Sequence, residues 1–191
     1  MVRRVAKALD IPFTVGGGIA TAEDVQTVLC NGADKVSVNT AALARPKLVE
    51  EIADSYGSQC VVVAIDAKTR AGTREGSYDV YSQSGERKSG RDAIDWAKEA
   101  EELGAGELLV TSIDRDGTRL GYDLKLLRKV SSSVGIPVIA SGGCGSLKHF
   151  LEALTKGGCD AALAASLFHY GELRIGEVKE YLASNSVVVR P

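Results

Sequence analysis

Short apolar runs alternate with longer amphipathic stretches along the chain. The apolar runs carry β-branched or small residues and are nearly continuous, which is typical of parallel strands covered on both faces. These predicted strands are 13–17, 35–40, 60–66, 107–113, 137–141 and 161–166. The amphipathic stretches predict helices over 2–9, 21–31, 45–56, 91–103, 123–133, 146–157 and 173–184. This alternation predicts an α/β fold in which βα units build a parallel sheet.

Glycines mark the ends of several predicted helices. Gly32, Gly104 and the Gly157–Gly158 pair each follow a helix and precede a strand, where a left-handed residue commonly ends a helix. The polar segment 68–90 interrupts the alternation and is longer than a usual connection between a strand and a helix. Within it, the string YDVYSQSG predicts a small hairpin or lid.

An internal repeat relates two parts of the chain. Residues 11–40 align with 136–166, an offset of 125 residues, with Gly17-Gly18 matching Gly142-Gly143. Two copies of a 125-residue segment give about 250 residues and eight βα units, which is the size of a (βα)8 barrel. In a chain of 191 residues we therefore expect a single domain over 1–191 of the TIM-barrel class, an incomplete (βα)8 barrel with six of its eight units and without the first two strands.

Composition narrows the function classes. A net charge of −2 with 25% charged residues argues against disorder and against a nucleic-acid-binding surface. No apolar run reaches the ~20 residues of a membrane span, and the start lacks the apolar core of a signal peptide. The widely spaced cysteines argue against a zinc site or disulfide framework, which fits a cytoplasmic protein; they are Cys30, Cys60, Cys144 and Cys159.

Two glycine-rich turns stand at equivalent ends of the repeated strands. Glycine lets the backbone approach an anion, and N–H groups at the start of the following helix point toward it. A single glycine-rich turn is explained more simply as a tight connection between a strand and the next helix. The repeat, however, places two such turns at equivalent positions. The pair predicts two phosphate cradles and a substrate with a phosphate at each end. The expected residues are Gly18, Asn39 and Thr40 in the first cradle and Gly143, Ala165 and Ser166 in the second, with Ser141 and Gly142 as further substrate- or phosphate-binding residues beside it.

Asp66 ends an apolar run at the same edge of the predicted sheet. Burial raises the pKa of a carboxyl group and suits it to general acid or base work. The structural alternative is an Asp66 paired with Lys68 or a loop N–H. Asp114 and Asp116 fit either a substrate contact or a turn, because Asp-Gly is a common turn pair. The remaining predicted substrate-binding residues are Thr111, Asp116 and Gly117.

Charged residues also begin two strands at the opposite edge. Lys35 and Glu107 lie there, and a solvent-facing rim is their simplest explanation. His149 and His169 have no Ser, Cys or metal-ligand partners in the sequence, so we expect packing or surface positions for them. Trp96 is expected in the core.

These residues together resemble the cyclase subunit of imidazole glycerol phosphate synthase, from histidine biosynthesis. The strings that carry the resemblance span essentially the whole chain in family order: FTVGGGI, GADKVSVNTAA, VVVAIDAK, GELLVTSIDRDGT, GYD, SGGCG, HFLEAL and DAALAAS. A sister family, the phosphoribosylformimino isomerase, shares the duplicated barrel and the paired phosphate sites. The IDRDGT and VSVNTAA strings favour the cyclase.

The resemblance implies a lyase reaction. Ammonia from a partner glutaminase attacks a bisphosphorylated formimino-ribulosyl aminoimidazole carboxamide, which is cleaved and closed to imidazole glycerol phosphate and the carboxamide ribotide. Asp66 matches one of the family's two catalytic aspartates. Lys35 and Glu107 match members of a charged gate for ammonia, which replaces the rim interpretation, and Asp34 and Gln59 match positions that face the glutaminase. No metal or organic cofactor is implied.

The chain also departs from the family pattern. The family's second catalytic aspartate, its mobile-loop lysine and two further gate residues belong to strands not found in this sequence. The expectation is therefore a cyclase subunit of impaired activity. The alternative is a non-catalytic, phosphate-binding fragment that self-associates through the open edges of the strands at Phe13 and Ala161.

Overall fold

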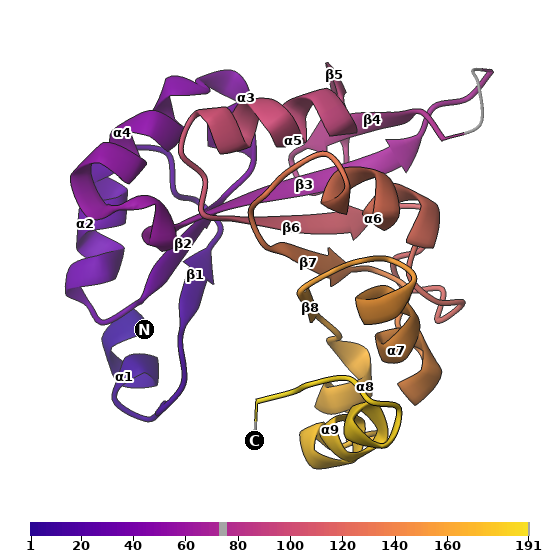
Figure 1. Ribbon diagram of the computed structural model, residues 1–191. Coiled ribbons are helices and arrows are strands. Elements are labelled where there is room, and N and C mark those ends of the chain that lie inside the picture. Colours follow the sequence, from indigo (N-terminus) through magenta and orange to yellow (C-terminus); the bar gives the residue numbers. More distant parts are fainter. Residues whose placement is uncertain (73–75, 191) are drawn as a thin grey trace.

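The computed structural model describes residues 1–72 and 76–190 (Figure 1). Six parallel strands form one curled sheet in the order β1-β2-β3-β6-β7-β8. Their bounds are β1 Thr14–Gly16, β2 Lys35–Val38, β3 Val61–Thr69, β6 Glu107–Ser112, β7 Val138–Ser141 and β8 Ala161–Ala162. Each lies within or overlaps a run that the sequence predicted as a strand. A curled parallel sheet with helices between its strands confirms the predicted α/β fold of the (βα)8 class.

Helices connect the strands and lie along the outer side of the arc in Figure 1. Side-chain caps explain where several begin: Thr21 and Asp24 form a capping box, and Asp92 and Asp123 accept N–H groups of the next helix. The bounds are α1 Val2–Ala6, α2 Ala22–Cys30, α3 Thr40–Ala44, α4 Lys47–Tyr56, a 3₁₀ turn Ser58–Cys60, α5 Ala93–Glu102, α6 Leu124–Ser131, α7 Leu147–Thr155, α8 Ser166–His169 and α9 Ile175–Ser184.

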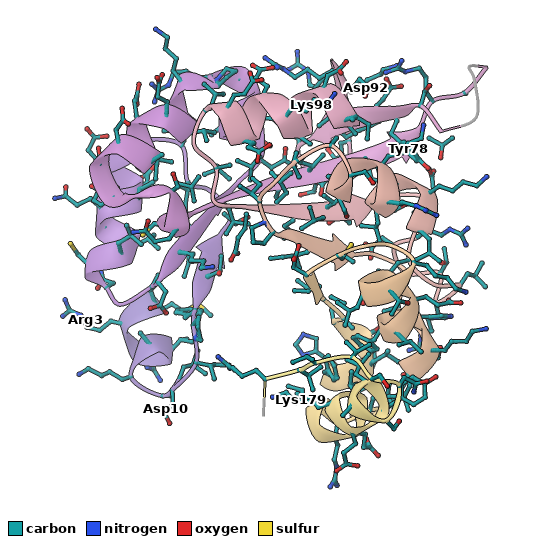
Figure 2. The ribbon with its side chains drawn as sticks, viewed as in Figure 1. Arg3, Asp10, Tyr78, Asp92, Lys98 and Lys179 are labelled. Carbon is teal, nitrogen blue, oxygen red and sulfur yellow. The ribbon has the colours of Figure 1, made fainter. Side chains whose placement is uncertain are left out.

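The core lies between the middle of the sheet and these helices. Lys98 on α5 points outward into solvent (Figure 2), whereas Trp96 on the same helix is 1% exposed, as predicted. Val63 and Ile65 of β3 are fully buried. Burying a large apolar side chain stabilises a fold by roughly 1.5–3 kcal/mol, so this packing fixes the positions of the central strands.

The two end strands differ from the central ones. Thr14 and Gly16 of β1 and Ala161 of β8 are exposed, and within the described residues β1 pairs with β2 and β8 with β7 alone. The expectation that every strand is covered on both faces is therefore wrong for β1 and β8. A strand at the end of a sheet has one unpaired side and fewer neighbours to cover it.

The predicted hairpin is confirmed. β4 Tyr78–Ser82 and β5 Arg87–Asp92 form an antiparallel pair, and β4 lies antiparallel to β3 with Tyr81 opposite Asp66. Asp79, 5% exposed, is paired with Arg70 and Lys88. Residues 73–75 of the polar segment lie outside the described part of the chain. The hairpin brings the turn after Ser82 to the edge where the predicted site lies.

Two short helices stand where the sequence predicted the last residues of strands. β2 ends at Val38 and β8 at Ala162, while α3 begins at Thr40 and α8 at Ser166. A strand pattern and the start of a helix are hard to distinguish in a short apolar run. The two repeated segments, 11–40 and 136–166, consequently share the same order of strand, helix, strand and short helix.

Candidate active site

Asp66 lies at the centre of the carboxyl-terminal edge of the sheet. β3 is the longest strand, so it extends beyond its neighbours and pairs there with β6 on one side, Asp66 opposite Thr111, and with β4 on the other, Asp66 opposite Tyr81. Active sites of (βα)8 proteins lie at this edge. The strand pairing thus surrounds a half-buried carboxylate with two other elements.

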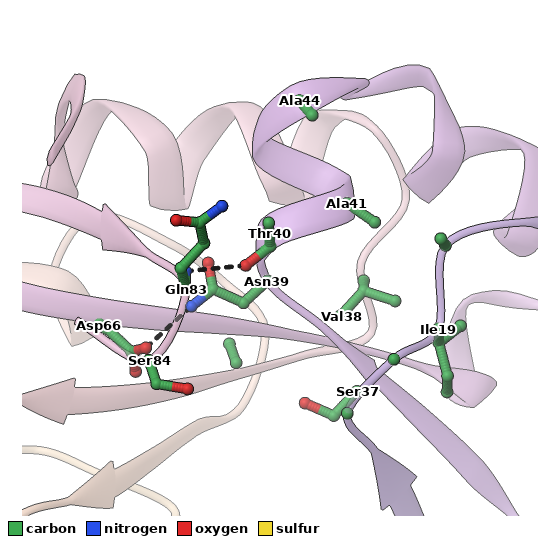
Figure 3. A pocket seen from close by; sticks show the side chains of 14 residues that line it. Ile19, Ser37, Val38, Asn39, Thr40, Ala41, Ala44, Asp66, Gln83 and Ser84 are labelled. Carbon is green, nitrogen blue, oxygen red and sulfur yellow. Dashed lines mark hydrogen bonds between the residues drawn. The ribbon is translucent and has the colours of Figure 1, made fainter. Parts of the chain in front are cut away.

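A pocket of about 500 Å³ opens beside Asp66 (Figure 3). Gly17 and Gly18 form one wall, Asn39 and Thr40 another. Both glycines have a positive φ, 88° and 77°, and a Cβ built on either meets nothing within 4 Å. The first predicted cradle is therefore an open, exposed turn with room for a ligand against its backbone.

A second pocket, of about 370 Å³, shares Asp66 with the first. Thr111 and Asp116, both predicted as substrate-binding residues, line it. Ser84, from the hairpin turn, lines both pockets. The carboxylate of Asp66 consequently lies between two cavities, a position from which it can reach the middle of a substrate that occupies both.

The surroundings of Asp66 shift the pKa of its carboxyl group. Burial raises the pKa of the Asp66 carboxyl, the side-chain hydrogen bond from Asn39 opposes that rise, and the negative charge of Asp116 adds to it. The hydrogen-bond partner is Asn39, at 2.9 Å, rather than the Lys68 of the structural alternative. A carboxyl with a raised pKa exchanges protons more readily near neutral pH, as acid–base catalysis requires.

A hydrogen bond joins the hairpin turn to the start of α3. The backbone N–H of Gln83 donates to Oγ1 of Thr40 at 3.0 Å (Figure 3). Gln83 and Ser84 both have left-handed backbones, with φ of 52° and 57°, which costs non-glycine residues free energy and is often found at functional sites. Because Thr40 accepts this bond, its own hydroxyl proton stays available to donate to a ligand in the pocket.

The second glycine turn has different surroundings. Gly142 and Gly143 are buried with φ of 87° and 97°, and a Cβ on Gly143 would lie 2.4 Å from the carbonyl oxygen of Gly121. Gly121 also donates its N–H to the Gly143 carbonyl at 2.8 Å. The loop 115–121 therefore covers this turn. Neither pocket beside Asp66 is lined by Ser141, Gly142, Gly143, Ala165 or Ser166.

Asp114 and Asp116, which the sequence left undecided, have separate positions. Oδ2 of Asp114 accepts the backbone N–H of Thr69 at 2.7 Å and so ties the end of β3 to the loop after β6. Asp116 faces the second pocket. Gly117, with φ of 73°, supplies the left-handed residue of that turn. The Asp-Gly pair is therefore a turn whose carboxylate also borders the candidate site.

Charged residues meet at the opposite edge of the sheet. Lys35 and Glu107, at the first residues of β2 and β6, form an ion pair with both side chains about one quarter exposed. Asp34 accepts the N–H of Phe13 at 2.7 Å, and the Gln59 amide donates to the Tyr56 carbonyl at 3.1 Å. The two residues that the resemblance implied as gate members thus contact each other across β3, which separates β2 from β6.

The histidines occupy a packing and a surface position, as predicted. Nδ1 of His149 accepts the N–H of Gly145 at 3.0 Å, and His169 is exposed. In the part of the chain that the structure describes, no group of three His, Cys, Asp or Glu could hold a metal ion. No helix of residues 1–72 or 76–190 is long and apolar enough to cross a bilayer.

Sequence reasoning missed the contribution of the hairpin to the site. Gln83 and Ser84 line the first pocket, yet the sequence predicted only a hairpin or lid at YDVYSQSG and no site residue within it. The signal that could have found them is the Ser-Gly pair in that string, which marks a turn. Where the turn lies depends on the antiparallel pairing of β4 with β3.

Comparison with known proteins identifies a family and a similar relative. A family model described as histidine biosynthesis protein matches residues 1–174. The imidazole glycerol phosphate synthase subunit HisF of Lachnoclostridium phytofermentans is 57% identical over 190 residues. That alignment covers 100% of this chain and 73% of the relative.

Proposed function

The chain belongs to the histidine biosynthesis protein family, and from this premise we propose that it is a cyclase subunit of imidazole glycerol phosphate synthase. The reaction is that of a lyase: ammonia enters a bisphosphorylated substrate, which is cleaved and closed to imidazole glycerol phosphate and aminoimidazole carboxamide ribotide. The observation that carries the proposal is the position of Asp66 between two pockets, the larger of which contains an open glycine turn.

One phosphate of the substrate binds in the first cradle. Gly18 brings backbone N–H groups close to the anion because no side chain fills the space. Thr40 donates its hydroxyl proton, since its oxygen already accepts the Gln83 N–H. Asn39 borders the same pocket.

The reacting centre lies beside Asp66. In its protonated form the carboxyl gives a proton to the departing nitrogen, and in its ionised form it takes one from the attacking ammonia. The raised pKa of Asp66 keeps both forms accessible. Thr111 and Asp116 border the next pocket and orient the middle of the substrate.

The other phosphate binds at the far end of the site, in the second cradle, outside the space above Gly142 and Gly143 that the chain itself fills. Its groups come from the ends of β7 and β8: Gly143, Ala165 and Ser166, with Ser141 and Gly142 beside them, and Gly117 contributes from the turn after β6. At the opposite edge, Lys35 and Glu107 act as a gate for ammonia. Asp34 and Gln59 face the glutaminase that supplies it, which docks on that side.

Self-association is a second proposal, carried by a separate observation. β1 and β8 each have an unpaired side in the described structure, and Ile11 and Leu163 beside them are 56% and 42% exposed. Open edges pair readily with another chain. Light scattering over a range of protein concentrations tests this: dimers or larger species support it, and a monomer at every concentration contradicts it.

Turnover with ammonia as nitrogen donor tests the cyclase proposal. We expect measurable formation of imidazole glycerol phosphate, reduced at least about 100-fold by Asp66→Asn, the scale of a lost general acid or base. Asp95→Asn, an exposed carboxylate on α5, is the control and should leave turnover unchanged. Absence of product from the unaltered chain contradicts the proposal and favours a non-catalytic phosphate-binding protein.

A further inference from the structure

We propose that Asn39 is a positioning residue whose side-chain amide holds the Asp66 carboxylate in the orientation that proton transfer requires. This inference rests on the proposed function, in which Asp66 is the acid and base. It assigns the Asn39 amide a task other than binding phosphate.

The contacts of Asn39 join three elements. Its Nδ2 donates to Oδ2 of Asp66 at 2.9 Å (Figure 3). It also donates to the backbone carbonyl of Tyr81 at 3.4 Å. Asn39 lies between β2 and α3, Asp66 is on β3, and Tyr81 stands opposite Asp66 on β4. The amide therefore links the carboxylate to β2 and β4, which pair with successive parts of the same edge of β3, opposite β6.

The orientation of the amide is dictated by these two acceptors. Nδ2 carries two N–H groups, one for each acceptor, whereas a reversed amide would turn Oδ1 toward a carboxylate and a carbonyl. Oδ1 is buried and has no hydrogen-bond partner among the described residues. An unpaired buried acceptor is costly. The hydrogen bond from Nδ2 to the charged Asp66 carboxylate offsets that cost and accounts for the position of the side chain.

The same geometry limits what Asn39 can do for an anion. Both of its amide protons are already used, so the side chain could bind a phosphate only by releasing Asp66 or Tyr81. Gly18 leaves open space beside the first pocket, and Thr40 keeps its hydroxyl proton available there. The side-chain role of Asn39 thus differs from that of its neighbours in the cradle.

Loss of the amide has a definite electrostatic consequence. The residues around Asp66 come from several elements: Asn39 after β2, Tyr81 on β4, Thr111 on β6 and Ser84 in the hairpin turn. The charge that acts on it is that of Asp116. Of these, the Asn39 N–H stabilises the ionised form. Removing it leaves burial and Asp116, both of which raise the pKa of Asp66.

A ¹³C NMR titration of the Asp66 carboxyl, assigned with Asp66→Asn, tests the inference without requiring turnover. In Asn39→Leu, which keeps the size and removes the donor, we expect the midpoint to move to higher pH. Asn31→Leu is the matched control, because the Asn31 amide donates to Thr27 on α2, and it should leave the midpoint unchanged. A midpoint that is unchanged or lower in Asn39→Leu overturns the proposal.

The unaltered protein provides a readout that survives if Asn39→Leu fails to fold. The side-chain amide proton of Asn39 should change its chemical shift with the same midpoint as the Asp66 carboxyl, and this change should vanish in Asp66→Asn. An amide shift that does not follow Asp66 overturns the proposal. Both NMR results stand even where the chain forms no product, so a failure of the cyclase proposal is distinguished from a failure of this one.

Kinetics separate positioning from substrate binding. Asn39→Leu should lower kcat about tenfold or more, since a small misplacement of a catalytic group is costly, and should leave KM within about twofold. A loss confined to KM with an unchanged pH profile would assign Asn39 to substrate binding instead and overturn the inference.

Discussion

The Gly17–Gly18 turn and the Gly142–Gly143 turn match in the repeated sequence and share left-handed backbones, yet their surroundings are opposite. An added Cβ meets nothing within 4 Å at the first, while at the second it meets backbone oxygens of Ser112 and Gly121 at 2.8 and 2.4 Å. At the first turn glycine leaves space for a ligand. At the second it leaves space for the chain itself.

This difference shows that one sequence signal has two physical origins. A glycine with positive φ is required at both turns because L side chains are strained there. Close approach of the loop 115–121 is an additional requirement at Gly143. Stability and ligand binding should therefore respond differently when the two turns are altered.

The largest effect is expected at the covered turn. Gly143→Ala places a Cβ against the Gly121 carbonyl and also strains the backbone, so we expect a loss of about 3 kcal/mol in the free energy of unfolding, or no stable fold. Urea denaturation measures it. A loss below about 1 kcal/mol would mean that the loop 115–121 moves aside easily.

Gly18→Ala is the corresponding change at the open turn. Only the positive φ penalises it, and we expect a loss of about 1 kcal/mol in stability. Because the methyl group enters the space proposed for phosphate, sulfate binding measured by calorimetry should weaken at least about tenfold. Equal affinity in Gly18→Ala and the unaltered chain would argue against the first cradle.

The carboxylate beside the open turn predicts a pH dependence of stability. Burial raises the pKa of Asp66 in the folded state, so the folded state binds this proton more tightly than the unfolded state. Its contribution to stability is present at low pH and is lost as the pH rises through the folded pKa. Asp66→Asn should remove that decline, so that its stability relative to the unaltered chain increases with pH.

Thermal unfolding from pH 3 upward, over the range about the ordinary Asp pKa of ~4, follows this relative stability. A difference that stays constant, or falls as the pH rises, would contradict the raised pKa. Asp95→Asn, on the outer face of α5, reports the effect of removing an ordinary exposed carboxylate.

The smallest effect concerns the loop that covers the second turn. Arg119, with φ of 62°, makes two hydrogen bonds to the Glu172 carboxylate at 2.6 and 3.0 Å. Both side chains are well exposed, so Arg119→Gln should cost only about 0.5 kcal/mol and less in high salt. Hydrogen exchange of the Gly121 N–H should nevertheless accelerate, because the loop is less restrained.

Arg45→Gln breaks a similarly exposed pair with Glu51 on α4, away from both turns. It should have a comparable effect on stability and none on exchange at Gly121. Faster exchange at Gly121 in both variants would show that the effect is general and that Arg119 does not restrain the loop.

The internal repeat and the glycine turns were visible in the sequence because they depend on local backbone geometry. The predicted strands and the six-strand parallel sheet followed from continuous apolar runs that alternate with amphipathic ones. α3 and α8 were missed, since Thr40–Ala44 and Ser166–His169 continue the small, apolar composition of the strands before them. The residue types there do not reveal where a strand turns into a helix.

Asp66 was predicted from its place at the end of an apolar run, together with the direction of its pKa. The hydrogen-bond partner of Asp66 was not predicted from the sequence. Asn39 is 27 residues away in the chain and reaches Asp66 only because β2 pairs with β3. Tyr81 and Ser84 come to the site because β4 folds back on β3.

The sequence by itself determined the α/β class, the family and the position of the carboxylate, since periodicity, glycine placement and motif order are properties of neighbouring residues. The tertiary structure decided that Gly17–Gly18 is open and Gly142–Gly143 is covered, and that the Asn39 amide binds Asp66. These features depend on which distant segments approach each turn. That approach is set by packing of the whole sheet, which local pattern does not encode.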